Sequence, residues 1–349
     1  MIDSAAHNLL GITLKSGWKV TEKITKTANS TGSVFSVCYK VEKDGSICFL
    51  KAFNFTPFFQ HSSPGQSIVD VLNDMLTAYR YERDLSEHCR NRHVTKVAFV
   101  IEAGEETIDN FAINIVPYLI FELADGDVRS KLDFSAKLDF AWKLHSLHDI
   151  AVGLQQLHNV NVSHQDLKPS NILVFRQDSK LGDLGRSMCK DMNSPYNKMS
   201  YTGDWNYAPP EMMYQYYDND WNKRVFATDC YLLGSMIVYY CAGISMSALL
   251  INQIPDTLNF RVWSGSPDEI KPYLAEAFSK AIIEFESNVD DDYFRKELSL
   301  LVEQLCFPFP EQRGHSKNVA NKFSSNFNLE RFITKLDVLT KKAKLKISG

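Results

Sequence analysis

The sequence HQDLKPSN, at residues 164–171, decides the fold of this chain. It lies between a long predicted amphipathic helix at residues 136–160 and a short predicted strand. Within it, Asp166, Lys168 and Asn171 place a carboxylate, an ammonium group and an amide in six consecutive positions. A polar turn of this length can also arise by chance. The flanking sequence is therefore needed to distinguish a chance turn from a functional site.

The triplet Asp183-Leu184-Gly185 begins twelve residues after Asn171. With this triplet the chain resembles the eukaryotic-type protein kinase family. Residues 164–171 match the catalytic loop H-R-D-L-x-x-x-N, and residues 183–185 match the metal-binding D-F-G. The resemblance covers roughly residues 18–316. It implies a kinase fold, ATP and Mg²⁺ as cofactors, and protein substrates.

The resemblance assigns the chemistry to four of these side chains. Asp166 is expected to orient the substrate hydroxyl and accept its proton, and Lys168 is expected to reach the γ-phosphate. Asn171 and Asp183 are expected to hold magnesium, because carboxylate and amide oxygens are hard ligands that suit this ion. A lysine two residues after Asp166 resembles the serine/threonine class of the family.

A further candidate, Lys51, ends the apolar strand CFLK. It matches the lysine of V-A-I-K, which holds the α- and β-phosphates of ATP. Its expected partner is a glutamate on the following helix, either Glu82 or Glu87, and Glu82 leaves the more typical spacing before the next strand. The separation of Lys51 and Glu82 is longer than is usual in the family, which implies an insertion near residues 54–66.

The glycine-rich loop G-x-G-x-x-G of the family corresponds to residues 30–37, in which only Gly32 is a glycine. The resemblance makes Thr31, Gly32 and Ser33 candidates for contacts with the phosphates. Glycine lets backbone N–H groups approach a phosphate closely, so the departure at Thr31 and Ser33 bears on nucleotide affinity. It removes no group that performs the chemistry.

Residues 121–127 resemble the hinge of the family. The resemblance implies that backbone groups of Glu122 and Ala124 bind adenine and that Asp127 contacts the ribose. Phe121 would then lie at the back of the adenine pocket, which is compatible with ordinary core packing.

Three residues, Glu211, Arg313 and Asp229, are expected to support the site rather than to perform chemistry. Residues 203–211 resemble G-T-x-x-Y-x-A-P-E, and the resemblance pairs Glu211 with Arg313 in a buried ion pair. Asp229 would accept hydrogen bonds from backbone N–H groups of the catalytic loop. Asp204 replaces the usual threonine, which predicts a difference in how the substrate is presented.

The residue before Asp166 is Gln165, where many members carry an arginine that contacts a phosphate on the activation loop. Glutamine cannot form a bidentate charged bond to phosphate. We therefore predict that basal activity does not require phosphorylation of this loop. The loop still carries hydroxyl groups, so self-phosphorylation stays open; they belong to Ser187, Ser194, Ser200, Tyr201 and Thr202.

The pattern along the chain predicts an α+β, bilobal, protein-kinase-like fold. Alternating strands near residues 18–28, 34–41, 46–53, 97–102 and 114–123, with one helix at 67–90, form a small β-rich N-lobe. A larger, mainly helical C-lobe follows, with short strands near residues 172–175 and 179–182. The expected divisions are an N-terminal extension at 1–17, the N-lobe at 18–121, a hinge at 122–128, and the C-lobe at 129–349.

Composition excludes several classes of protein. The formal net charge of −4 lacks the basic excess of a nucleic-acid binder, and 44% hydrophobic content with 12% aromatics argues against a disordered chain. The seven cysteines are odd in number and widely spaced, without C-x-x-C, which indicates reduced thiols in a cytoplasmic protein. The first residues do not show a basic region followed by a long apolar stretch, so a secretory signal is not expected.

One charge-free stretch, residues 230–255, has the length of a membrane span. Its glycines, serines and tyrosines favour a helix buried inside the larger lobe, so no membrane span is expected. Residues 328–347 predict a last helix with a lysine-rich end. We interpret it as docked and solvated, with a contact to a membrane surface or an acidic partner as the alternative.

The sequence thus predicts a serine/threonine protein kinase. One alternative is a pseudokinase that acts as a nucleotide-binding scaffold, which the altered glycine-rich loop favours. Another is a kinase of a small molecule on a related fold. Lys51, Asp166, Asn171 and Asp183 count against the first, and the stretch at 203–211 favours a protein substrate over the second.

Overall fold

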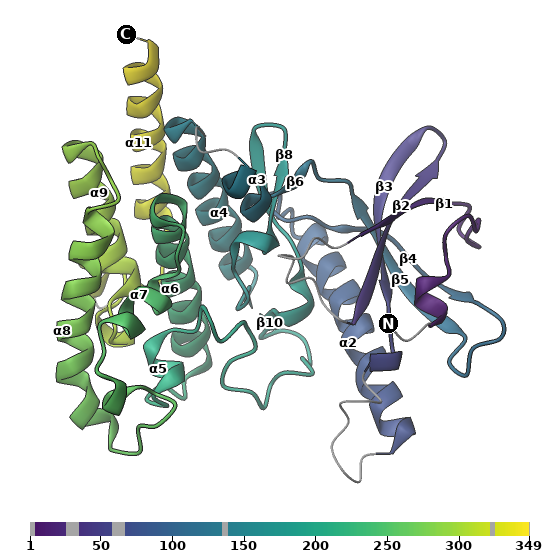
Figure 1. Ribbon diagram of the computed structural model, residues 1–349, viewed down its shortest axis with the longest axis horizontal. Helices are drawn as coiled ribbons and strands as arrows, with labels where there is room; N and C mark the ends of the chain where they lie inside the picture. The colour runs from purple at the N-terminus through teal and green to yellow at the C-terminus, as the bar shows by residue number, and fades with distance from the viewer. Residues whose placement is uncertain (1–3, 26–34, 58–66, 135–138, 322–324, 349) are drawn as a thin grey trace. The chain divides into compact units, whose positions relative to one another are not determined.

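The computed structural model describes residues 4–25, 35–57, 67–134, 139–321 and 325–348. The chain divides into two compact units (Figure 1). The first unit contains residues 1–93, 97–125 and 182–185, and the second contains residues 94–96, 126–181 and 186–349.

The first unit is built on a five-stranded antiparallel sheet in the order β1-β2-β3-β5-β4. The strands are β1 (Lys19–Ile24), β2 (Ser36–Lys43), β3 (Ser46–Phe53), β4 (Val100–Thr107) and β5 (Ile115–Glu122). β2 and β3 form a hairpin through Asp44 and Gly45, whose φ angles of 50° and 75° match the two-residue turn that twists with its strands. The strand predicted at 46–53 is confirmed.

One long helix, α2 (Ile68–Asn91), accompanies this sheet. The hydroxyl of Ser67 caps it by accepting from the backbone N–H of Asp70. Its buried side chains lie at helical spacing, and the ring of Tyr79 packs edge-on against Phe53 of β3. The predicted helix at 67–90 is confirmed, and it places residue 82 on the inner face.

Residues 4–18 pack into the core of the first unit. Ala6, Leu9 and Leu14 are buried in the same cluster as Tyr39 of β2 and Tyr118 of β5. The Tyr39 hydroxyl donates to the carbonyl oxygen of Ala6 at 2.8 Å. The segment that the sequence presents as an extension therefore supplies part of the hydrophobic core.

We expect Leu9→Ala to lower the free energy of unfolding by about 2–3 kcal/mol, because it leaves a cavity in a packed core. Leu9 is 0% exposed, whereas the adjacent Leu10 is 55% exposed. Leu10→Ala is the matched control and should change stability by less than about 0.5 kcal/mol. Urea unfolding of both variants measures the difference. Equal effects would contradict a core role for this segment.

The second unit is mainly helical. Its longer helices are α4 (Phe140–Asn159), α6 (Trp221–Ala242), α8 (Pro267–Glu286), α9 (Asp292–Cys306) and α11 (Glu330–Ser348). The shorter ones are α3 (Val128–Phe134), α5 (Pro210–Met213), α7 (Met246–Asn252) and α10 (Ser316–Val319). α11 lies beside α4 along much of its length, so the predicted last helix is docked (Figure 1).

Helix α6 is long and apolar enough to cross a membrane by length and composition, and 78% of its most apolar stretch is buried inside the protein. It contacts α4 and α9, and it ends at Gly243, whose φ of 72° suits glycine. The interpretation of residues 230–255 as buried is confirmed, although α6 and α7 divide the stretch.

Two small sheets carry the loop at residues 164–171. β7 (Val162–Ser163) pairs with β10 (Met188–Cys189) before the loop. After it, β8 (Ile172–Phe175) lies between β6 (Gly126–Asp127) and β9 (Asp178–Leu181). Both ends of the loop are thus anchored by backbone pairing.

Candidate active site

The carboxylate of Asp229 on α6 organises the loop that follows β7. It accepts the backbone N–H groups of His164 and Gln165, each at 2.9 Å, and the hydroxyl of Ser163 at 2.8 Å. His158 Nε2 lies 2.9 Å from the same carboxylate. The backbone contacts of Asp229 were predicted from the sequence. The contacts of His158 and Ser163 were not, because they depend on how α4 and β7 pack against α6.

Asp229 is fully buried. Burial raises the pKa of its carboxyl, but the hydrogen bond from His158 and the backbone N–H of Gln165 lower it more, so the pKa lies below its ordinary value. The carboxylate is therefore ionised at neutral pH. Hydrogen bonds to an ionised acceptor are stronger than neutral ones, which explains how it holds the loop.

Both oxygens of the Asp166 carboxylate are engaged within the second unit. Asn171 Nδ2 donates to Asp166 Oδ2 at 3.0 Å and to the Asp166 carbonyl oxygen at 2.8 Å. The backbone N–H of Asp204 donates to Asp166 Oδ1 at 2.9 Å, and Lys168 Nζ lies 3.1 Å from Oδ2. The structure thus brings the three predicted catalytic side chains together around one carboxylate.

Asp204 is closer to this cluster than the sequence suggested. Its Oδ2 lies 3.4 Å from Lys168 Nζ, so Lys168 has a carboxylate on either side. The preceding residue, Gly203, has no room for a side chain, because a Cβ there would come within 2.2 Å of the Gln165 carbonyl oxygen. The sequence marked Asp204 as unusual, because an aspartate stands where threonine is typical. Its contact with Lys168 was not predictable, because it forms only when the loop at residues 203–211 packs against the loop at residues 164–171.

A second cluster lies in the first unit. Lys51 Nζ on β3 is 2.9 Å from Glu82 Oε1 on α2 and 3.0 Å from Asp183 Oδ1. Of the two glutamates predicted as partners of Lys51, Glu82 is buried and contacts it, whereas Glu87 is exposed. Burial lowers the pKa of Lys51, but the charges of Asp183 and Glu82 raise it more, so its pKa lies above the ordinary value and the cation persists.

The backbone around Asp183 is shaped for this contact. Asp183 itself adopts φ = 54°, a conformation that only short polar residues and glycine adopt readily. A Cβ at Gly185 would come within 3.0 Å of both Asp183 Oδ1 and Glu82 Oε2, so a glycine leaves the space that the two carboxylates need.

The remaining predicted nucleotide contacts divide between the units. Glu122 ends β5 opposite Cys48, and Ala124 follows it half-buried in the first unit. Asp127, in the second unit, accepts from the backbone N–H and hydroxyl of Ser130 at 2.8 and 2.9 Å and so caps α3. The candidates Thr31, Gly32 and Ser33 lie outside the described residues.

A buried ion pair supports the loop at residues 203–211. Arg313 is 0% exposed and donates to both oxygens of Glu211, at 2.6 and 2.8 Å. It also donates to the carbonyl oxygens of Ala227 and Phe307. This arrangement satisfies both charges in the protein interior, as the sequence analysis expected.

The protein kinase domain model matches residues 65–322, which is more than half of the chain. The chain belongs to the protein kinase family. The expected α+β fold, with a β-rich part and a mainly helical part, is confirmed.

Curated relatives are similar to this kinase over part of their length. The chain is 28% identical over 172 residues to a dual serine/threonine and tyrosine protein kinase of Strongylocentrotus purpuratus, covering 49% of the chain and 16% of that protein. It is 28% identical to an Aurora kinase of Debaryomyces hansenii, covering 36% and 30%. Over 250 residues it is 28% identical to the inhibitor of nuclear factor kappa-B kinase subunit alpha of Gallus gallus, covering 67% and 30%. The match thus spans less than a third of each relative.

Gln165 of the kinase is turned into the protein interior. Its φ is 65°, its side chain is fully buried, and its Nε2 donates to Ser163 Oγ and to the Val225 carbonyl oxygen at 2.7 and 3.0 Å. Glutamine thus serves to hold the catalytic loop rather than to meet a group on the loop that follows Asp183.

Four of the five loop hydroxyls considered for self-phosphorylation belong to buried residues. They are Ser187, Ser194, Tyr201 and Thr202, whereas Ser200 is half-buried. The Thr202 hydroxyl donates to the Arg186 carbonyl oxygen at 2.7 Å, and the Ser187 hydroxyl donates to the His164 carbonyl oxygen at 3.3 Å. Modification of the buried four would require the loop to open.

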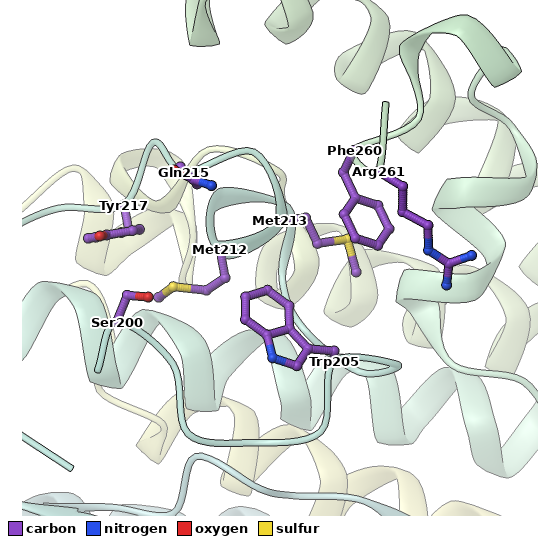
Figure 2. Close-up of a pocket in the computed structure, with 8 residues that line it drawn as sticks. All are labelled: Ser200, Trp205, Met212, Met213, Gln215, Tyr217, Phe260 and Arg261. Atoms are coloured by element: carbon purple, nitrogen blue, oxygen red, sulfur yellow. The ribbon is translucent and has the colours of Figure 1, made fainter. Parts of the chain in front are cut away.

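A depression of about 600 Å³ in the second unit is lined in part by Ser200, Trp205, Met212 and Met213. Figure 2 shows Trp205, Met213 and Phe260 near one another at its apolar side, with Arg261 at the edge. Trp205 follows Asp204 directly, and the backbone of Asp204 contacts Asp166. Trp205 is 51% exposed, so the depression presents an aromatic ring next to the residue whose backbone contacts Asp166.

Proposed function

We propose that this kinase transfers the γ-phosphate of ATP to serine or threonine hydroxyls of protein substrates. The observation that carries the proposal is the hydrogen-bonded cluster of Asp166, Lys168, Asn171 and Asp204. It combines a carboxylate of fixed orientation with an adjacent cation, which is what in-line transfer to a hydroxyl requires.

Each side chain has a stated task in this proposal. Asp166 orients the substrate hydroxyl and accepts its proton, and Lys168 neutralises charge on the transferred phosphate. Lys51, held by Glu82, binds the α- and β-phosphates. The backbone of Glu122 and Ala124 would bind adenine, and Asp127 the ribose.

Asn171 and Asp183 each carry a side-chain oxygen of the kind that a hard divalent ion such as Mg²⁺ prefers. Asn171 donates to Asp166 through its amide nitrogen, so its carbonyl oxygen is the atom that would face a metal. Asp183 supplies a carboxylate, which such ions prefer. When bound, Mg²⁺ would neutralise charge on the phosphates of ATP.

Transfer from γ-labelled ATP with magnesium tests the proposal. The acceptors are peptides identical except for serine, threonine or tyrosine at one position, and a metabolite extract. Label on the serine and threonine peptides supports the proposal, and label on the tyrosine peptide would extend the specificity. Label confined to metabolites would favour a small-molecule kinase. ATP binding without any transfer would favour a pseudokinase, the role suggested by the altered loop at residues 30–37.

We further expect basal activity to survive removal of phosphate from the kinase. Gln165 carries no charge, and its side chain is already hydrogen-bonded to Ser163 and Val225. We therefore do not expect it to bind a phosphate group on the loop that follows Asp183. Phosphatase-treated and untreated kinase should differ by less than about twofold in rate, since no charged pair of this kind is lost. A loss of nearly all turnover after phosphatase treatment would contradict this expectation.

A further inference from the structure

A group of potential metal ligands lies on α4, in the second unit. His145, His148 and Asp149 occupy positions i, i+3 and i+4, which share one face of a helix. Asp149 is 1% exposed, whereas the side chains of His145 and His148 are 30% and 24% exposed. The group therefore combines a buried carboxylate with two imidazoles that solvent reaches.

The donor atoms are spaced like ligands of one ion. His145 Nε2 lies 3.8 Å from Asp149 Oδ2, and His148 Nδ1 lies 3.6 Å from Asp149 Oδ1. These distances are too long for hydrogen bonds. One donor atom from each residue lies within 4.8 Å of the others, and ligands bound tetrahedrally to zinc at about 2.0–2.2 Å are about 3.3–3.6 Å apart, so the side chains would move closer together on binding an ion.

Two further observations point to a ligand here. Nδ1 of His148 is buried and has no hydrogen-bond partner among the described residues. Asp178 on β9 places its Oδ1 3.7 Å from His145 Nε2, so a second carboxylate is available from a neighbouring element. A buried nitrogen without a hydrogen-bond partner, 3.6 Å from the Asp149 carboxylate, is suited to bind a cation or a water.

We propose that His145, His148 and Asp149 bind a divalent transition-metal ion of the zinc class, with Asp178 or water completing the coordination. Two imidazoles favour zinc, copper or nickel over magnesium or calcium, which prefer oxygen ligands. The site is thus chemically distinct from the magnesium ligands Asn171 and Asp183. Bound metal would tie α4 to β9.

Lys96 provides the competing cation. Its Nζ lies 2.8 Å from Asp149 Oδ1 and 3.1 Å from Asp178 Oδ1, so in the absence of metal the ammonium balances both carboxylates. Its side chain is 24% exposed, which leaves a path to solvent. Metal binding must displace this cation, so affinity should rise when Lys96 is replaced by an uncharged residue.

The experiment is a titration of this chain, treated with chelator, with zinc and without nucleotide or substrate, followed by calorimetry. We expect one saturable site, weakened at least about tenfold by His145→Ala and by His148→Ala, and tightened about tenfold by Lys96→Met. His88→Ala is the matched control, because it removes a half-buried histidine from α2 and should leave zinc affinity unchanged.

Circular dichroism establishes that each variant is folded, and the partly exposed histidines make this the expected result. No saturable zinc binding, or equal affinity in wild type, His145→Ala and His148→Ala, would overturn the proposal. So would a loss caused equally by His88→Ala. Since the titration contains neither ATP nor substrate, none of these outcomes depends on the proposed phosphate transfer.

Discussion

Replacing Asp166 by asparagine is expected to lower the rate of phosphate transfer by roughly 10²- to 10⁴-fold, the usual contribution of a positioned general base. Asparagine keeps the shape and one oxygen, so the hydrogen bond from the backbone N–H of Asp204 can persist. It removes the negative charge that would orient and deprotonate the substrate hydroxyl. The measurement is the initial rate of label transfer from γ-labelled ATP.

The control for this variant is Asp290→Asn, which makes the same chemical change at an exposed position of the second unit. Its rate should equal that of the wild type. Thermal unfolding should show that Asp166→Asn remains folded, because Asn171 and Lys168 still have the Asp166 backbone and Asp204 as partners. Wild-type rates in the Asp166→Asn variant would remove Asp166 from the mechanism.

Removing either partner of the Glu211–Arg313 pair is expected to destabilise the protein by about 3–5 kcal/mol. Both side chains are almost completely buried, at 1% and 0% exposure, so Arg313→Ala leaves a carboxylate without its counter-charge in the interior. It also orphans the carbonyl oxygens of Ala227 and Phe307. Urea unfolding of the wild type and both single variants measures the free energy.

The double variant Glu211→Ala/Arg313→Ala makes this test sharper. Because each single change strands a charge that the double change removes, the double variant should cost less than the sum of the two. Lys341→Ala, which breaks an exposed pair with Asp337, should change stability little. Strict additivity of Glu211→Ala and Arg313→Ala would show that the buried pair acts as two independent residues.

The partner of Lys51 was predicted from the sequence as Glu82, with Glu87 as the alternative, and packing explains why Glu82 fills this role. The pattern at residues 67–90 predicted a helix, and Glu82 and Glu87 both lie within it. Which glutamate faces Lys51 depends on the rotation of α2 against β3, and Tyr79, about one turn before Glu82, packs on Phe53 of β3. The spacing before the next strand had favoured Glu82, and the structure agrees, with Glu82 Oε1 2.9 Å from Lys51 Nζ and Glu87 exposed.

Contiguous motifs explain what the sequence alone determined: the family, the α+β fold, and the carboxylates, amide and lysines of the candidate site. Local order suffices there, because residues 164–171 and 183–185 each carry their chemistry within a few positions. The tertiary structure decided the rest, including the core position of residues 4–18, the contact of His158 with Asp229, and the place of Asp204 beside Lys168. These contacts join segments far apart in the chain, and their free energy comes from burial and hydrogen bonds that exist only once the elements pack.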